Sequence, residues 1–212
     1  MQNRGYSKNQ ELVNIATVLS AVFSFANATS ICTSNGHGFR DGDVVRISSE
    51  TTLPDGLLDT VNYFVKVINA NTFYLYLDSE FKTLATATDD GTGDHTFVLQ
   101  SRKMNVKDYK VVVISLSTTG DANFTMKCQG SSKDEAPEFA DAASATNPWS
   151  YVQMVNLDDG DTIDGNVGTG PIGTDINTQY EVNTNALSWI CFDFTTVTTG
   201  KAQMVASGFD NN

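Results

Sequence analysis

The side chains best suited to chemistry begin with His37, which lies between two glycines in the stretch NGHGFRDGDVVRISS (residues 35–49). Ser34 precedes this stretch, and Asp41 and Asp43 follow the histidine. Nucleophilic catalysis pairs a histidine with a hydroxyl or thiol and an orienting carboxylate. Here all the candidates fall within one loop, whereas hydrolase sites draw their members from separate elements. The pattern therefore favours a structural corner over an active site.

The remaining metal-ligand and thiol residues do not form a recognisable site. His95 is the only other histidine, and the spacing does not indicate that it converges with His37 and carboxylates on a metal. Cys32, Cys128 and Cys191 are widely separated and form no CxxC pair, which argues against a zinc site and a disulfide framework. We expect each cysteine to be a small buried hydrophobic side chain.

One acidic stretch, DDGDTIDGN (residues 158–166), is a candidate cation site. Asp159 and Asp161 follow the alternating spacing of calcium-binding loops and are the candidate ligands. The pattern then breaks, because Ile163 occupies the next ligand position and Gly170 stands where a bidentate Glu would close the loop. A solvated hairpin tip is the favoured interpretation, and no cofactor is expected.

The glycine-rich stretch GTGPIGT (residues 168–174) is not a phosphate-binding loop. A phosphate cradle needs a following Lys-Ser/Thr pair and the start of a helix, and the sequence provides neither. We expect a loop that could pack against a neighbouring subunit.

Charge and hydropathy exclude two classes of partner. The chain carries 25 acidic and 13 basic residues, a formal charge of −12, so the clustered cations that bind a nucleic-acid backbone are missing. The most apolar segment, residues 12–25, is interrupted by polar residues and is shorter than the roughly 20 residues that span a bilayer. It also lacks the features of a secretory signal. We expect no nucleic-acid and no membrane partner.

Short strands dominate the pattern that must position these residues. They are rich in β-branched and aromatic residues and are bounded by Gly, Asn, Asp or Ser. Residues 12–25 are compatible with a helix or with strands, and the neighbouring strands favour the latter. The spacing predicts an all-β barrel or sandwich. The expected strands are residues 44–48, 63–68, 72–77, 95–100, 110–116, 123–129, 151–156, 187–194 and 202–207.

The polar stretch SRKMNVKDY (residues 101–109) is the expected boundary between two β-domains. Residues 12–101 would form a small barrel-like domain, and residues 110–212 a β-sandwich of jelly-roll-like type. Residues 1–11 are polar without periodicity and predict a flexible N-terminal arm, in which Arg4 and Tyr6 are interface candidates.

Residues 131–150 form the longest stretch without strand character. Long connections in compact domains are uncommon and are often functional. Phe139 and Trp149 are aromatic anchors in polar surroundings, which is typical of a contact loop. They are interface candidates, with folding back onto the core as the alternative.

Four motifs follow one another in residues 30–100: the turn GHGFRDGDV, the loop LPDGL, the hairpin YFVKVINANTFYL and the closing strand GTGDHT. In this order they resemble a small β-domain that recurs in structural proteins of tailed bacteriophages. The later segments NPWSYVQMVNLDDGDTIDG and LSWICFDFTTVTTGKAQMVASG are similar to β-sandwich domains of virion decoration and tail-associated proteins.

The resemblance implies a non-enzymatic virion protein, made in the host cytoplasm and carried on the phage particle, in which His37 fixes a turn. The first expectation is a capsid decoration (cement) protein that forms a homo-oligomer, with a trimer favoured, and binds the major capsid protein or other virion proteins. A tail, baseplate or fibre component is the alternative.

Two further classes remain open at the level of sequence. A carbohydrate-binding module would use Trp149, Trp189 and Tyr180 as stacking platforms. A glycoside hydrolase would need two carboxylates at roughly 5–10 Å, and the abundance of acids does not exclude such a pair.

Overall fold

The computed structural model describes residues 8–14, 16–135, 149–171 and 175–209, and these contain strands but no helix. The described residues divide into two compact units, residues 16–100 and a second unit formed by residues 8–14 with 101–209. The predicted all-β class, with a barrel followed by a larger antiparallel sheet of sandwich type, is confirmed. No described segment could span a membrane as a helix.

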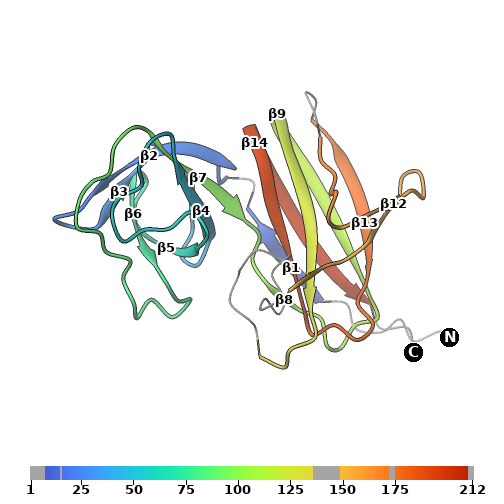
Figure 1. Cartoon of the computed structure of the whole chain (residues 1–212). Coiled ribbons are helices and arrows are strands. Elements are labelled where there is room, and N and C mark those ends of the chain that lie inside the picture. The colour runs from blue at the N-terminus through green and yellow to red at the C-terminus, as the bar shows by residue number, and fades with distance from the viewer. Residues whose placement is uncertain (1–7, 15, 136–148, 172–174, 210–212) are drawn as a thin grey trace. The chain divides into compact units, whose positions relative to one another are not determined.

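Residues 16–100 form a closed barrel of six strands in the order β2-β3-β6-β5-β4-β7 (Figure 1). Alternation along β6 turns Phe73 and Leu75 inward. Phe23, Phe39 and Phe97 complete an aromatic core around Phe73, with ring centroids 4.7 to 6.3 Å apart. The strands are β2 (Ser20–Ala26), β3 (Ile31–Thr33), β4 (Val44–Ser49), β5 (Asn62–Asn69), β6 (Thr72–Tyr76) and β7 (His95–Gln100).

The second unit is one antiparallel sheet with the strand order β1-β14-β9-β13-β11-β12 (Figure 1). Two short strands lie off this path, since β10 pairs with β9 and β8 pairs with β14. The strands are β1 (Lys8–Val13), β8 (Met104–Asn105), β9 (Val111–Ser131), β10 (Ser150–Tyr151), β11 (Met154–Asn156), β12 (Thr162–Ile163), β13 (Asn177–Asn183) and β14 (Trp189–Phe209).

Two 21-residue strands, β9 and β14, form the spine of this sheet. Each was expected as two short strands, because polar residues interrupt the apolar pattern at residues 117–122 and 195–201. In the structure the chain continues through these interruptions as irregularities in the ladder, with positive φ at Gly120 and Asp121 on β9 and at Thr196 and Gly200 on β14. The same alternate residues stay buried on both sides of the break in β9.

The N-terminal boundary differs from the prediction. Lys8–Val13 is not part of a flexible arm but a strand, β1, that pairs with the end of β14. Leu12 and Val13 are almost fully buried, so this segment belongs to the sheet and not to the barrel. Residues 1–7, with Arg4 and Tyr6, lie outside the described residues.

The predicted linker, residues 101–109, is a structural part of the sheet unit. Ser101 donates its amide to Phe192 O and accepts the Phe192 amide on its hydroxyl oxygen. Met104 and Val106 are fully buried. The barrel is therefore an insertion between β1 and β8, and the chain changes units near residues 15 and 101.

Candidate functional sites

His37 holds the corner between β3 and β4 through both ring nitrogens. Its Nδ1 accepts the Phe39 amide at 2.9 Å, and its Nε2 lies 3.1 Å from Asn69 O. An accepting Nδ1 must be unprotonated, so Nε2 carries the proton and donates it to the Asn69 carbonyl. The ring is 1% exposed and stacks on Phe39 at 4.8 Å. Its neutral form is thus built into the barrel.

Burial lowers the pKa of His37, and hydrogen bonds to Asn69 and Thr72 and the charge of Asp43 oppose this shift less strongly. The nearby polar side chains form hydrogen bonds with backbone atoms. Ser34 donates its hydroxyl to Val22 O, and Asp43 accepts the Arg40 amide. His37, Ser34 and Asp43 therefore bond to three different parts of the backbone. Together they stabilise the structural corner that the sequence predicted.

Asp41 ties the same corner to β5. Its carboxylate accepts the Val67 amide at 2.8 Å and forms an exposed ion pair with Lys66. These contacts lower the pKa of Asp41, with the Lys66 hydrogen bond as the main cause. Its role in the structure is to fix the approach of the turn to β5.

His95 performs a similar task at the start of β7. Its Nδ1 lies 3.1 Å from Ser49 Oγ, and its Nε2 lies 2.9 Å from Asp90 O. The ring is buried against Phe23, with centroids 5.7 Å apart. Within the described ranges, no three His, Cys, Asp or Glu side chains are arranged to hold a metal ion.

All three cysteines are free and buried, as expected from the sequence. Burial raises the pKa of the Cys32 and Cys128 thiols far above their ordinary value. Because the thiolate is the reactive form, these side chains are poor nucleophiles in the folded protein. Cys191 packs against Trp149 and lies 3.9 Å from Gln129 Oε1.

The calcium candidates Asp159 and Asp161 form the turn between β11 and β12. The Asp159 carboxylate accepts the Asp161 amide at 2.9 Å and the Asn156 side-chain amide at 3.0 Å. Asn156 and Asp161 close the turn through their backbones. Both acids are exposed. The arrangement is the solvated hairpin tip favoured by the sequence.

The glycine-rich stretch packs within its own chain. Gly168 and Gly170 flank Thr169, which bridges to Met126 of β9. A Cβ on Gly170 would lie 2.0 Å from Phe124 O, and one on Gly168 would lie 2.6 Å from Met126 O. The glycines are required for this close approach to β9. The expected contact with a neighbouring subunit is untested, and residues 172–174 lie outside the described residues.

Trp149 is not an interface anchor. It is 1% exposed and packs in a cluster with Cys191, Tyr151 and Trp189, so the alternative of folding back onto the core is correct for this residue. Tyr180 is also buried, and Trp189 is half-buried. The three proposed sugar platforms thus do not form an exposed set. Phe139, the other interface candidate of this loop, lies outside the described residues.

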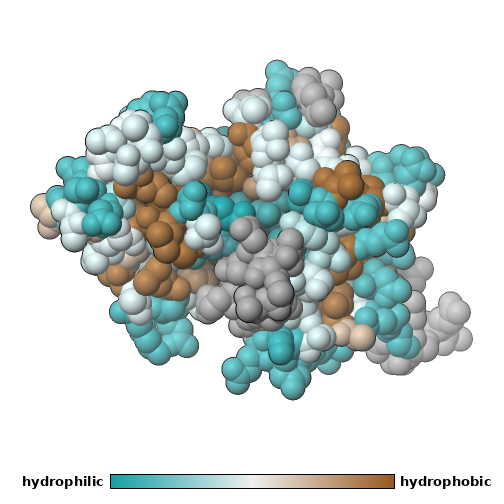
Figure 2. Space-filling model, in the orientation of Figure 1, coloured by the Kyte–Doolittle hydropathy of each residue, from teal (hydrophilic) through white to brown (hydrophobic). Residues whose placement is uncertain are grey.

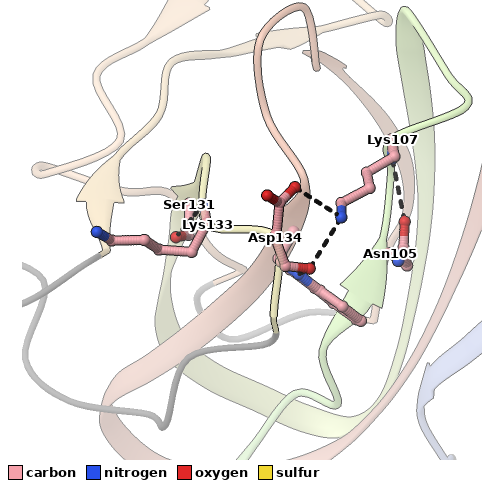
Figure 3. Close-up of polar contacts among 6 residues, drawn as sticks. Asn105, Lys107, Ser131, Lys133 and Asp134 are labelled. Carbon is pink, nitrogen blue, oxygen red and sulfur yellow. Dashed lines mark hydrogen bonds and ion pairs between the residues drawn. The ribbon is translucent and has the colours of Figure 1, made fainter.

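A contact that the sequence did not predict fixes the start of this long connection. Lys107 Nζ donates to Asp134 O at 2.9 Å and to its carboxylate at 3.1 Å, and Trp189 Nε1 lies 3.5 Å from the same carbonyl (Figure 3). Lys133 points away from this pair in Figure 3. Asp134 is almost fully exposed, so we assign the contact a positioning role of small energy.

Two clefts formed by the described residues have room for a small ligand, besides a smaller one of about 300 Å³ beside residues 48–59. One, of about 470 Å³, lies on the barrel between β2, the end of β3 and residues 90–95. The other, of about 500 Å³, lies on the sheet unit between residues 107–110, Asp134 and the turn at residues 184–188. Hydrophilic loops border hydrophobic patches on the visible face of each unit (Figure 2). Neither cleft presents a recognisable catalytic set.

No protein-family model matches the sequence, and no curated protein matches it significantly.

Proposed function

We propose that this chain is a non-enzymatic structural protein of a tailed-phage virion, most specifically a decoration protein that forms a symmetric oligomer on the capsid. The observation that carries the proposal is the use of the reactive side chains. Both histidines and all three cysteines are buried, and the histidine nitrogens contact backbone carbonyls, an amide and a serine hydroxyl. A protein that acts by folding and binding needs no other chemistry from them.

The resemblance of residues 30–100 to phage β-domains is the reason for proposing a location on the virion. Symmetric assembly on a shell requires complementary surfaces and no cofactor. The partner in this proposal is the major capsid protein or another virion protein, and a trimer would match three-fold positions of a shell.

The location can be tested on particles whose genome encodes this chain. An antibody raised against the purified protein is imaged by negative stain on intact particles. Label distributed over the capsid supports decoration, whereas label along the tail replaces it with a tail, baseplate or fibre role. Particles without label contradict the virion proposal altogether.

The stabilising action has its own test. Capsids lacking this protein are heated with and without the purified chain. We expect bound protein to raise the temperature at which the shells open. Failure of the chain to bind, with unchanged heat resistance, contradicts the cement role.

A further inference from the structure

The ladder between β2 and β7 of the barrel opens before β2 ends. The pairing of these strands runs from Ser20–Val98 to Phe23–His95 and stops there. Continued by two residues, it would place Phe25 opposite Gly93. The chain around Gly93 instead bonds to the segment that follows β4, where Thr92 and Thr52 exchange two hydrogen bonds and Asp94 O accepts the Glu50 amide.

The opening leaves the backbone groups of Phe25 directed into the barrel cleft without a ladder partner. The Leu99 amide bonds Leu19 O, so in this antiparallel pair the backbone groups of alternate residues of β2, including Phe25, are directed to the β7 side. Thr92 and Asp94 bond to the segment that follows β4, and Gly93 between them has φ +76°, so the chain is bent there and does not continue as a strand. Within the described chain, neither Phe25 nor Gly93 has a ladder partner across this gap.

Both ends of the opening are fixed. Phe23 and His95 pair below it, and above it the Asn27 amide donates to the Asp90 carboxylate at 2.6 Å. Gly93 has φ +76°, and a Cβ there would lie 2.5 Å from Thr51 Oγ1, so its position is tightly constrained. The cleft is therefore a preformed gap in the sheet.

The lining of the cleft is acidic. Asp90 and Asp94 are exposed, Ser24 and Val22 cover the floor, and no Lys or Arg lines it. Val22 is 53% exposed and offers an apolar surface. An extended segment could bond the backbone of Phe25 and place a basic side chain beside the acids.

We propose that this cleft receives the N-terminal segment of a second copy of the chain, with Arg4 of that segment beside Asp94. Residues 1–7, MQNRGYS, contain the basic Arg4 and no acid in a chain of net charge −12, so their charge is complementary to the cleft. The segment leads directly into β1, which is already extended. The inference deepens the proposed self-assembly and rests on it for the choice of a second copy.

Charge reversal and its rescue test the pairing by sedimentation velocity of the full chain. Asp94 is exposed, and its contact with other described residues is made by its carbonyl, so Asp94→Lys should fold normally, which circular dichroism verifies. We expect the wild type to be an oligomer and both Asp94→Lys and Arg4→Asp to dissociate at least tenfold more readily. The double variant Arg4→Asp/Asp94→Lys should regain the oligomer. Asp59→Asn, an exposed acid of the barrel outside this cleft, should change nothing.

A peptide of residues 1–9 provides the second readout. Its binding to the chain lacking residues 1–7 is followed by fluorescence anisotropy, and we expect Asp94→Asn to weaken it about fivefold and added salt to weaken it further. A monomeric wild type, an oligomer unaffected by either reversal, or equal binding of an Arg4→Glu peptide overturns the inference. These solution measurements do not depend on the labelling of particles. The virion proposal and the docking of the N-terminal segment can therefore be contradicted separately.

Discussion

The residues that look reactive in this sequence are the ones that determine the backbone path. His37 accepts the amide two residues ahead and reaches Asn69 of the β5–β6 hairpin, while His95 joins the end of β4 to the loop before β7. The sequence predicted the corner at His37, because flanking glycines and a following Asp-Gly pair are turn signals. It could not predict the partners, which lie 32 and 46 residues away.

The neutral ring of His37 predicts a specific loss of stability in acid. Because folding lowers its pKa, the unfolded chain takes up a proton first as the pH falls below about 6.5. The contribution of His37 to stability is therefore constant above that pH and falls below it, by at most about 1.4 kcal/mol per pH unit until the folded pKa is reached.

Calorimetry of the wild type and His37→Gln between pH 7.5 and 5 measures this loss. Gln can accept one hydrogen bond and donate another without titrating, so the unfolding temperature of this variant should fall less with acid. Parallel falls in both proteins would show that other groups cause the acid sensitivity.

Two glycines of the same corner separate backbone strain from steric contact. Gly36 and Gly38 have similar positive φ values of 62° and 69°. A Cβ on Gly36 meets no atom within 4 Å, whereas one on Gly38 would lie 2.1 Å from Ala16 O.

We expect Gly36→Ala to destabilise the barrel by about 1 kcal/mol, the cost of the left-handed conformation. Gly38→Ala should cost about 3 kcal/mol or more, because the carbonyl of Ala16 must also move. Urea denaturation of both variants measures the difference. Equal losses would mean that the segment at Ala16 yields without cost.

At the scale of elements, the local sequence pattern predicted the positions of the barrel strands. It failed for elements whose structure depends on contacts with distant parts of the chain. Residues 44–48, 63–68 and 72–77 were predicted to within two residues of β4, β5 and β6. The polar β1 was missed, since an edge strand needs little apolar surface. The continuity of β9 and β14 was missed because their irregularities are accommodated by tertiary contacts, which include the Asp121 amide that donates to the Asp175 carboxylate. Trp149 was expected either as a contact anchor or as a core residue, and its packing against Cys191 and Trp189, which are distant in sequence, places it in the core.

The turn between β13 and β14 contains an alanine in a backbone conformation that favours glycine. Ala186 has φ +67° and is exposed, and Leu187 N bonds Thr184 O across it. A left-handed alanine costs roughly 1 kcal/mol, and glycine adopts this conformation freely at the expense of more unfolded-state entropy.

Ala186→Gly should therefore stabilise the sheet unit by about 0.5 kcal/mol. Asn185→Gly, in the same turn but without a positive φ, should destabilise it by a similar amount. Both tryptophans belong to the sheet unit, so their fluorescence during chemical unfolding reports on this unit. A loss of stability in Ala186→Gly would contradict the assignment of strain.

At the scale of the whole molecule, the chain leaves and re-enters the sheet unit at one place. Arg102 donates its amide to Leu12 O at 3.0 Å, and Gln10 donates its side-chain amide to Lys103 O. The segments on either side of the barrel are therefore hydrogen-bonded neighbours within the sheet unit. No strand of the barrel enters the ladder of the sheet.

Replacement of residues 16–100 by a linker of about six Gly and Ser residues should leave the sheet unit folded. The ends already lie side by side, so a short linker closes a small loop at lower entropic cost than the 85-residue insertion spanning positions 16–100. Each unit has its own buried apolar core and hydrogen-bond network, which satisfies the requirement for independent folding. We expect the shortened chain to unfold cooperatively, with buried tryptophan emission and an unfolding temperature within a few degrees of the sheet transition of the full chain. A shortened chain that lacks a cooperative transition, while the full chain has one, would mean that the sheet requires the barrel to fold.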